Sequence, residues 1–261
     1  MEAPPDRPGA SKLPAEQKKP WYRKTNRLLA LAAFVISVLT FVNSQYIETH
    51  RSKQQQLRQV LSELIELRKE SRMVDENPNY PHAQDELDRI ADSRFIYLES
   101  AQQLIAGLWL REVSSAEFDA LAYDETNAGN YDLAKRYLSD ALEVNANLSD
   151  KSTALQLLGD LLFRRFHDAA GGRQVFDEAA KVPLPWTNLA DSGLLYETWG
   201  ADELDFGERD KGIDKIKIAI KYFCGLPEDD TLRKQGVDRI TRLLADHHVQ
   251  DSSIQFCATS R

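Results

Sequence analysis

The sequence predicts an all-α protein in which a single transmembrane helix precedes a solenoid of helical hairpins. One uncharged, apolar stretch lies near the N-terminus. After Pro81 the apolar residues recur at helical spacing, and no run shows the alternation of a half-buried strand. Small residues also recur at related positions with periods of 38 and 40 residues, which indicates an internal repeat.

Charge is unevenly distributed along the chain. Residues 1–43 hold seven Lys/Arg and three Asp/Glu, whereas the remaining residues hold 26 Lys/Arg and 38 Asp/Glu. An acidic body repels the phosphate backbone of DNA and RNA, so we expect no nucleic-acid binding. The first 20 residues contain five prolines and are expected to form a disordered tail.

The apolar stretch begins with residues 28–42, LLALAAFVISVLTFV, in which Ser37 and Thr40 are the only polar residues. Extended to Ile47, it reaches about the 20 residues with which a helix crosses a hydrocarbon core. We therefore expect a transmembrane helix over residues 21–47. A cleavable signal peptide is the alternative, but the 27-residue leader is long for one and an Ala-x-Ala motif is missing.

The flanks of this stretch indicate its orientation in a membrane. Trp21, Tyr22 and Tyr46 stand near its two ends, where amphipathic rings favour the interface. Cations are more frequent on the N-terminal side than on the C-terminal side: Lys12, Lys18, Lys19, Arg23, Lys24 and Arg27 against Arg51, Lys53 and Arg58. Positive flanks stay in the cytoplasm, so the sequence predicts a single-pass inner-membrane protein with a cytoplasmic N-terminus and a periplasmic domain.

Residues 48–81 are expected to form a helical stalk that ends near Pro78. An apolar stripe at heptad spacing runs along it, widened on one side, and consists of Leu57, Val60, Leu61, Leu64, Ile65 and Leu67. Two interpretations remain open. The stripe forms a dimerising coiled coil, or it packs against the domain that follows; two heptads are fewer than a coiled coil usually shows.

Residues 82–248 are expected to form the helical domain. Its first helix is predicted over residues 83–112. Ser114 and Glu117 then form a capping box, in which the Ser oxygen accepts a backbone N–H and the Glu carboxylate reaches back to the cap. The helix that they begin is expected to stop at Gly129.

A hairpin motif follows the capping box, and its second helix is expected over residues 131–144. The motif resembles the tetratricopeptide repeat in its order of small and large residues: Phe118-x2-Leu121-Ala122, then Gly129-x-Tyr131-x2-Ala134-x3-Leu138-x2-Ala141-Leu142. Two degenerate copies follow, Leu158-Gly159 with Gly172-x3-Phe176-x2-Ala179, and Tyr196-x2-Trp199-Gly200 with Gly212-x3-Ile216-x2-Ala219. The resemblance covers residues 114–226 and implies a stack of helical hairpins.

The C-terminal part supplies a cap and a tail. A helix from Asp229 to His247 is expected to close the stack with a polar outer face, and residues 249–261 follow as a tail. Cys224 and Cys257 are too few for a disulfide framework or a zinc site. They either form one bridge in an oxidising compartment or remain two thiols with Cys224 buried.

No constellation of residues indicates catalysis. Gly171-Gly172 lacks the Lys-Ser/Thr of a phosphate loop, and neither a Gly-x-Ser-x-Gly nor a His-Glu-x-x-His motif occurs. His167 next to Asp168 is interpreted as a surface turn. The densest acidic cluster lacks the spacing of a calcium loop and is interpreted as a solvated segment; it consists of Asp202, Glu203, Asp205 and Glu208. We expect no enzyme, no metal site and no cofactor.

The resemblance implies a binding groove, lined by the first helix of each hairpin, that receives peptides or partner helices. The matching positions are Asp119, Tyr123, Thr126 and Asn127 in the first copy, and Glu197, Ala201, Leu204 and Asp205 in the third. Asp119 stands where some family members place the Lys of a carboxylate clamp. A basic or amphipathic partner is therefore expected.

These expectations combine into one function and one alternative. The chain is predicted to be a membrane-anchored scaffold or adaptor that holds a protein or peptide partner near the membrane. Its architecture as a whole is similar to that of bacterial membrane-anchored tetratricopeptide proteins. The alternative is a structural membrane component that self-associates, as a homo-oligomer, through its stalk and repeats.

Overall fold

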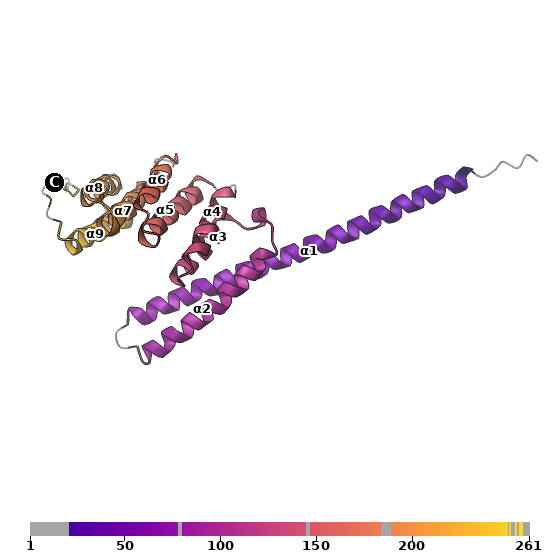
Figure 1. Cartoon of the computed structure of the whole chain (residues 1–261), viewed down its shortest axis with the longest axis horizontal. Coiled ribbons are helices and arrows are strands. Elements are labelled where there is room, and N and C mark those ends of the chain that lie inside the picture. The colour runs from indigo at the N-terminus through magenta and orange to yellow at the C-terminus, as the bar shows by residue number, and fades with distance from the viewer. Residues whose placement is uncertain are drawn as a thin grey trace, which may run out of the picture. The chain divides into compact units, whose positions relative to one another are not determined.

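The computed structural model of the protein describes residues 21–77, 80–144, 147–183 and 189–249, together with residues 251, 254, 256 and 257. The tail expected over residues 1–20 lies outside this part of the chain. All regular structure in the described residues is helical, with nine α-helices and one short 3₁₀ helix (Figure 1). The chain divides into an N-terminal unit, Met1–Thr49, and a C-terminal unit, His50–Arg261.

Helix α1 covers Trp21–Asp75 and contributes to both units. In its N-terminal part the apolar side chains from Leu29 to Ile47 are exposed rather than packed against protein. One window of this helix has a mean hydropathy of 1.6 and contains no buried residue. By length and composition the helix is therefore able to cross a membrane, a property that signal sequences share.

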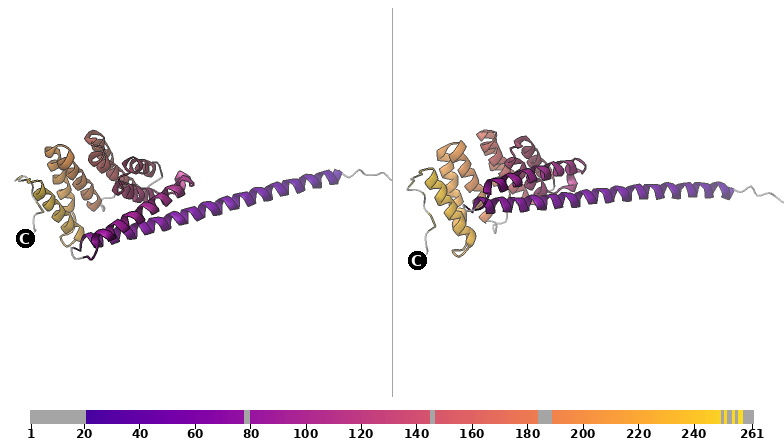
Figure 2. Two further views of the ribbon diagram at one scale, coloured as in Figure 1. Left: turned by 60° about the horizontal axis from the view of Figure 1, so that its bottom comes forward. Right: turned by 90° about the horizontal axis from the view of Figure 1, so that it is seen from below.

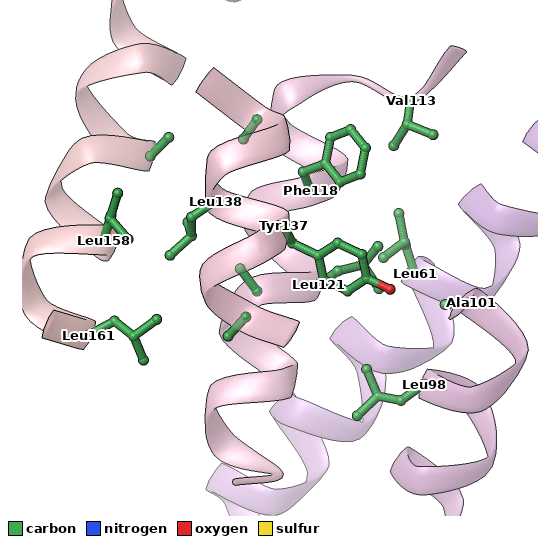
Figure 3. Close-up of a cluster of buried hydrophobic side chains, with 14 of the residues drawn as sticks. Leu61, Leu98, Ala101, Val113, Phe118, Leu121, Tyr137, Leu138, Leu158 and Leu161 are labelled. Carbon is green, nitrogen blue, oxygen red and sulfur yellow. The ribbon is translucent and has the colours of Figure 1, made fainter. Parts of the chain in front are cut away.

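The rest of α1 belongs to the C-terminal unit and pairs with α2, which covers Ala83–Ala106 and runs back alongside it (Figures 1 and 2). The leucine face of α1, defined by Leu57, Leu61, Leu64 and Leu67, is buried. It packs on α2 and on the helices that follow, as Figure 3 shows for Leu61 beside Phe118, Leu121 and Tyr137. The structure therefore shows the second interpretation of the apolar stripe, in which it packs against the domain that follows.

Three hairpins and a final helix follow α2. They are α3 (Ser115–Asn127) with α4 (Tyr131–Glu143), α5 (Leu148–Arg164) with α6 (Ala169–Ala180), α7 (Leu189–Phe206) with α8 (Arg209–Cys224), and α9 (Thr231–Asp246). Each helix from α3 to α9 contacts the next one. The first helices of successive hairpins also touch, α3 with α5 and α5 with α7, and α7 touches α9 (Figure 2).

Local signals determined the ends of several helices as predicted. The Ser114 hydroxyl accepts the Glu117 N–H at 3.3 Å, and the Glu117 carboxylate accepts the Ser114 N–H at 2.7 Å, so the capping box is formed. Gly129 has φ of 84°, a left-handed conformation that glycine adopts without strain and that turns the chain from α3 into α4. One prediction was wrong: the helix expected over residues 83–112 ends at Ala106, and only a 3₁₀ helix, Leu110–Glu112, follows.

Two glycine pairs bring the helices of the second and third hairpins together. A Cβ atom on Gly172 would lie 3.2 Å from the carbonyl oxygen of Gly159, and one on Gly212 would lie 3.0 Å from that of Gly200. Each added carbon would also meet a large side chain of the same hairpin. The small residues of the repeated motif are thus needed for close backbone approach.

A disulfide joins Cys224 at the end of α8 to Cys257 in the tail, with their Cα atoms 5.2 Å apart. Of the two interpretations of the cysteines, the structure shows the bridge. The tail residues Val249 and Ile254 pack on the core that Ile240 and Leu244 form with α8. The bridge therefore fastens the C-terminal segment to the last helices of the stack.

Candidate functional site

A cavity of about 280 Å³ lies between α3 and α5, at the C-terminal ends of both helices. We call it the α3–α5 cavity. Three of the four groove residues expected in the first copy line it, namely Tyr123, Thr126 and Asn127. The opposite wall and the floor come from α5 and α4, and the residues there are Leu138, Leu157, Asp160, Leu161, Arg164 and Arg165.

Helix geometry explains why these side chains meet. Thr126 and Asn127 follow Tyr123 by three and four residues and therefore lie on the same face of α3 as its ring. The Thr126 hydroxyl donates to the Ala122 carbonyl at 2.7 Å, which fixes its rotamer. The guanidinium of Arg68, from α1, lies 4.8 Å from the centre of the Tyr123 ring. The ring is thus held between the cavity and a cation–π contact.

Asp119, the fourth residue expected in the first copy, does not line this cavity. Its side chain is buried on α3, with 8% of the residue exposed, and its Oδ1 atom has no hydrogen-bond partner in the described part of the chain. Burial raises the pKa of Asp119 to about 7, and the charge of Asp150 on α5 adds to the rise. Its carboxyl group is therefore largely shielded from solvent.

The residues expected in the third copy have other neighbours. Glu197 accepts two hydrogen bonds from Arg239 of α9, at 2.7 and 2.8 Å. Leu204 packs towards α8 in the core of the last hairpin, and Ala201 is half-buried. Asp205 lies 3.0 Å from His247. The two sets of groove residues are therefore not gathered in one cavity, and two members of the third-copy set are engaged by Arg239 and His247.

Arg164 is the residue that sequence reasoning missed. It lines the α3–α5 cavity, and its Nε atom lies 2.6 Å from Asp160 and 2.8 Å from Asp202. One of its terminal nitrogens is 3.7 Å from Asp205. It thus links the cavity on α5 to the acidic end of α7. The sequence could indicate only the contact between Arg164 and Asp160, because these two residues have the i,i+4 spacing of a helical ion pair.

The acidic cluster at the end of α7 and the start of α8 is solvated only in part, whereas the sequence suggested a solvated segment. Asp202 and Glu203 have no exposed surface, although Asp205 and Glu208 are exposed. Burial raises the pKa of Asp202, and the neighbouring Asp160 raises it further, while Arg164 opposes the rise. Burial also favours the neutral form of Glu203, but hydrogen bonds from Arg173 and from the Glu208 N–H give it a net lowered pKa.

No family model matches the chain, and neither the curated proteins nor the solved structures include a significant match.

The α3–α5 cavity combines an apolar floor with a polar rim of mixed charge. Its floor is formed by leucines, and its rim carries one carboxylate, Asp160, and two guanidinium groups, Arg164 and Arg165. Arg165 also lies 5.1 Å from the centre of the Tyr131 ring. Such a cavity suits an apolar side chain flanked by polar groups. We assign no reaction to the Asp160–Asp202 pair, because Asp202 has no surface that a substrate would touch.

The His167–Asp168 pair has a local structural role, as interpreted from the sequence. His167 is exposed and adopts a positive φ of 52°. The Asp168 carboxylate accepts the Gly171 N–H at 2.8 Å and caps the N-terminus of α6. The pair forms the turn between α5 and α6.

Proposed function

We propose that this protein is a single-pass, membrane-anchored scaffold that binds a protein or peptide partner through a tetratricopeptide-like stack of helical hairpins. One observation carries the proposal. The first helices of successive hairpins, α3, α5 and α7, touch one another in order, and a cavity with an apolar floor opens between the first two. A solenoid of this kind exposes its first helices as a continuous binding surface.

The chemistry of the cavity supports an amphipathic partner segment. Leu157 offers apolar contact to an inserted side chain, while Tyr123, Asn127 and Arg165 surround the opening with polar groups. The groove is less acidic than expected from the sequence, since Asp119 is buried and Asp160 is paired with Arg164. We therefore favour an amphipathic partner over a purely basic one.

The disulfide supports an extracytoplasmic domain. Stable disulfides are rare in reducing cytosol and common in the periplasm and other oxidising compartments. The cation-rich N-terminal flank points the same way, because it keeps the N-terminus in the cytoplasm. The two arguments are independent, one resting on charge in the first 27 residues and the other on Cys224 and Cys257.

Topology is the first test. A reporter active only in the periplasm and one active only in the cytoplasm are each fused after Arg261. The proposal expects activity from the periplasmic reporter alone. Alkylation of thiols in intact cells, before and after reduction, checks the same point without a fusion: Cys224 and Cys257 should react only after reduction. A cytoplasmic signal with both thiols freely alkylated contradicts the proposed topology.

Binding is the second test. A photoreactive phenylalanine analogue replaces Tyr123 in the full chain, and cells are irradiated. The matched control carries the same analogue at Gln174, an exposed position on α6. Binding at the α3–α5 cavity is supported if adducts form at position 123, if Asn127→Ala reduces their yield, and if none form at position 174. Equal yields of adduct at both positions, or a yield that Asn127→Ala does not change, contradict binding at this cavity.

The self-associating alternative has one observation in its favour. The leucine face is covered within the chain, but Phe95 and Ile96 on α2 are exposed side by side. Sedimentation of the detergent-solubilised full chain, compared with a Phe95→Ser/Ile96→Ser variant, tests it. A dimer that the double substitution dissociates favours this alternative over the scaffold.

A further inference from the structure

The segment between α2 and α3 is bound to the first turns of α1 that follow the apolar stretch. We call it the interfacial loop, Gly107–Glu112. The Gln54 side chain donates to the Glu112 carbonyl at 2.9 Å, and Lys53 Nζ donates to the Gly107 carbonyl at 3.3 Å. His50 Nδ1 lies 2.7 Å from the Glu112 carboxylate. Three successive contacts thus hold the loop to residues 50–54 of α1.

The loop presents large apolar side chains to solvent. Trp109 is 66% exposed and Leu110 is 37% exposed, and Arg111 beside them is exposed as well. The backbone is well defined, since the Trp109 N–H donates to the Glu112 carboxylate at 2.7 Å. The exposure therefore belongs to an ordered loop. An ordered, exposed indole next to an Arg is the combination that favours a membrane–water interface.

The position of the loop along the chain determines what it can reach. His50 comes three residues after Ile47, the end of the apolar stretch. At 1.5 Å per helical residue, this places His50 roughly 5 Å beyond the hydrocarbon, within the headgroup layer of about 5–8 Å on each side. Since Glu112 contacts His50 directly, the loop that contains Trp109 lies next to that layer.

We propose that Trp109, Leu110 and Arg111 form a second membrane contact, in which the indole and the leucine enter the interface of the bilayer crossed by α1. Arg111 and the exposed Arg51 would face lipid phosphates there. The contact is a binding site for phospholipid on the domain itself. It rests on the proposed membrane span, and it fixes one side of the domain against the surface in addition to the covalent anchor.

The exposed aromatic on α2 provides a contrast. Phe95 is 65% exposed, as much as Trp109. It lies twelve residues before Gly107, roughly 18 Å along a helix from the interfacial loop. No contact ties it to residues 50–54 in the described part of the chain. A tryptophan at position 95 is thus a matched control for one at position 109.

Fluorescence quenching by lipid tests the proposal with the full chain. The protein is reconstituted into vesicles of phosphatidylcholine and phosphatidylglycerol, with or without bromine on acyl carbons near the headgroup. Trp21→Phe, Trp109→Phe and the double variant are compared. The Trp21→Phe signal minus the double-variant signal reports Trp109. The Trp109→Phe signal minus the double-variant signal reports Trp21, which precedes the apolar stretch.

We expect the Trp109 signal to fall by about half in brominated vesicles and to be protected from aqueous iodide, as for an indole at the interface. Phe95→Trp in the double-variant background should show the opposite, with iodide quenching and no effect of bromine. If bromine quenches Trp21 but not Trp109, the second contact is refuted while the span remains. If it quenches neither, both the span and the contact are refuted.

Discussion

Helices α3 and α7 begin the first and third hairpins, and they carry the same acidic dipeptide with different neighbours. When the helices are aligned on Ala122 and Gly200, Asp124-Glu125 and Asp202-Glu203 occupy equivalent positions. None of the four carboxylates has exposed surface. Two hairpins therefore bury two acids each, which is rare unless a specific partner compensates the charge.

The glutamates of the two dipeptides have similar structural roles. Glu125 accepts a hydrogen bond from the Asn130 side chain at 2.7 Å, across the turn into α4. Glu203 accepts the Glu208 N–H at 3.0 Å, across the turn into α8, and two hydrogen bonds from Arg173. In both hairpins the buried glutamate closes the turn between the two helices.

The aspartates differ. Each oxygen of Asp124 faces its own arginine at 3.1 Å, Arg68 from α1 and Arg94 from α2. Burial raises the pKa of Asp124, but both guanidinium groups oppose the rise. Asp202 shares the single Nε–H of Arg164 with Asp160, and its second oxygen has no partner among the described residues.

Five residues earlier on each helix the contrast is reversed. Glu197 on α7 is paired with Arg239 of α9, whereas Asp119 at the equivalent place on α3 is buried near Asp150. The arginines that face Asp124 come from α1 and α2, whereas the arginine that pairs with Glu197 comes from α9. The protonation of a repeated acid is thus decided by the helices that flank its hairpin rather than by the repeat itself.

The largest effect is expected for Asp124→Asn. Among the described residues it removes the one carboxylate that pairs with both Arg68 and Arg94 and leaves two half-buried cations, so the free energy of unfolding should fall by roughly 3–5 kcal/mol. Thermal unfolding of the full chain in detergent measures it, with Asp92→Asn on the exposed face of α2 as the control. A loss no larger than the control's would remove the basis of the comparison.

Asp202→Asn should act in the opposite direction and depend on pH. The pKa of Asp202 is raised to about 8. The stability that its protonated form provides is complete below about pH 4 and is lost as the pH rises through about 8. Asn keeps the neutral form, so the variant should match the parent at pH 4.5 and exceed it at pH 9 by on the order of 3 kcal/mol. A variant less stable than the parent at pH 9 contradicts this.

Asp119→Asn should also increase the stability of the fold at high pH, and the increase should appear over a lower pH range than for Asp202→Asn. Because its folded pKa is about 7, the stability from the protonated carboxyl is lost as the pH rises from about 4 through 7. At pH 8.5 the variant should be more stable than the parent by on the order of 2 kcal/mol, and at pH 4.5 the two should coincide. Unfolding curves at both pH values check it, and a difference independent of pH would disprove the assignment.

The smallest effect is expected for Glu197→Gln, the neutralised counterpart of Asp119. Its partner Arg239 keeps partial access to water, so losing the ion pair should cost about 1 kcal/mol. The same unfolding assay should show no gain in stability at high pH. A gain like that of Asp119→Asn would mean that α7 and α3 are neutralised alike.

Local features of the fold were predictable from sequence. The capping box at Ser114, the turn at Gly129 and the close approach at Gly159 and Gly172 each depend on residues of one hairpin. Hydrogen bonds and backbone preferences over such short separations follow from residue type. The three side chains on one face of α3 that line the cavity follow from the same helical periodicity.

Features that depend on distant segments were not predictable. Asp202 and Glu203 looked solvated because nothing near them in sequence suggested Arg164, 38 residues away, or Arg173. Glu197 looked available to a partner because Arg239 belongs to another helix. A charged side chain is buried or solvated according to which opposite charge the tertiary fold supplies, and a single sequence does not show that pairing.

The bridge between Cys224 and Cys257 has a mechanical consequence. Helix α9 lies wholly within the loop that the bridge closes, whose two cysteines are 33 positions apart in the sequence. A force that pulls on the chain beyond Cys257 passes through the sulfur atoms directly to the end of α8 and bypasses α9. The last helix is therefore shielded from tension applied at the C-terminal side, and such a load is borne by the α7–α8 hairpin instead.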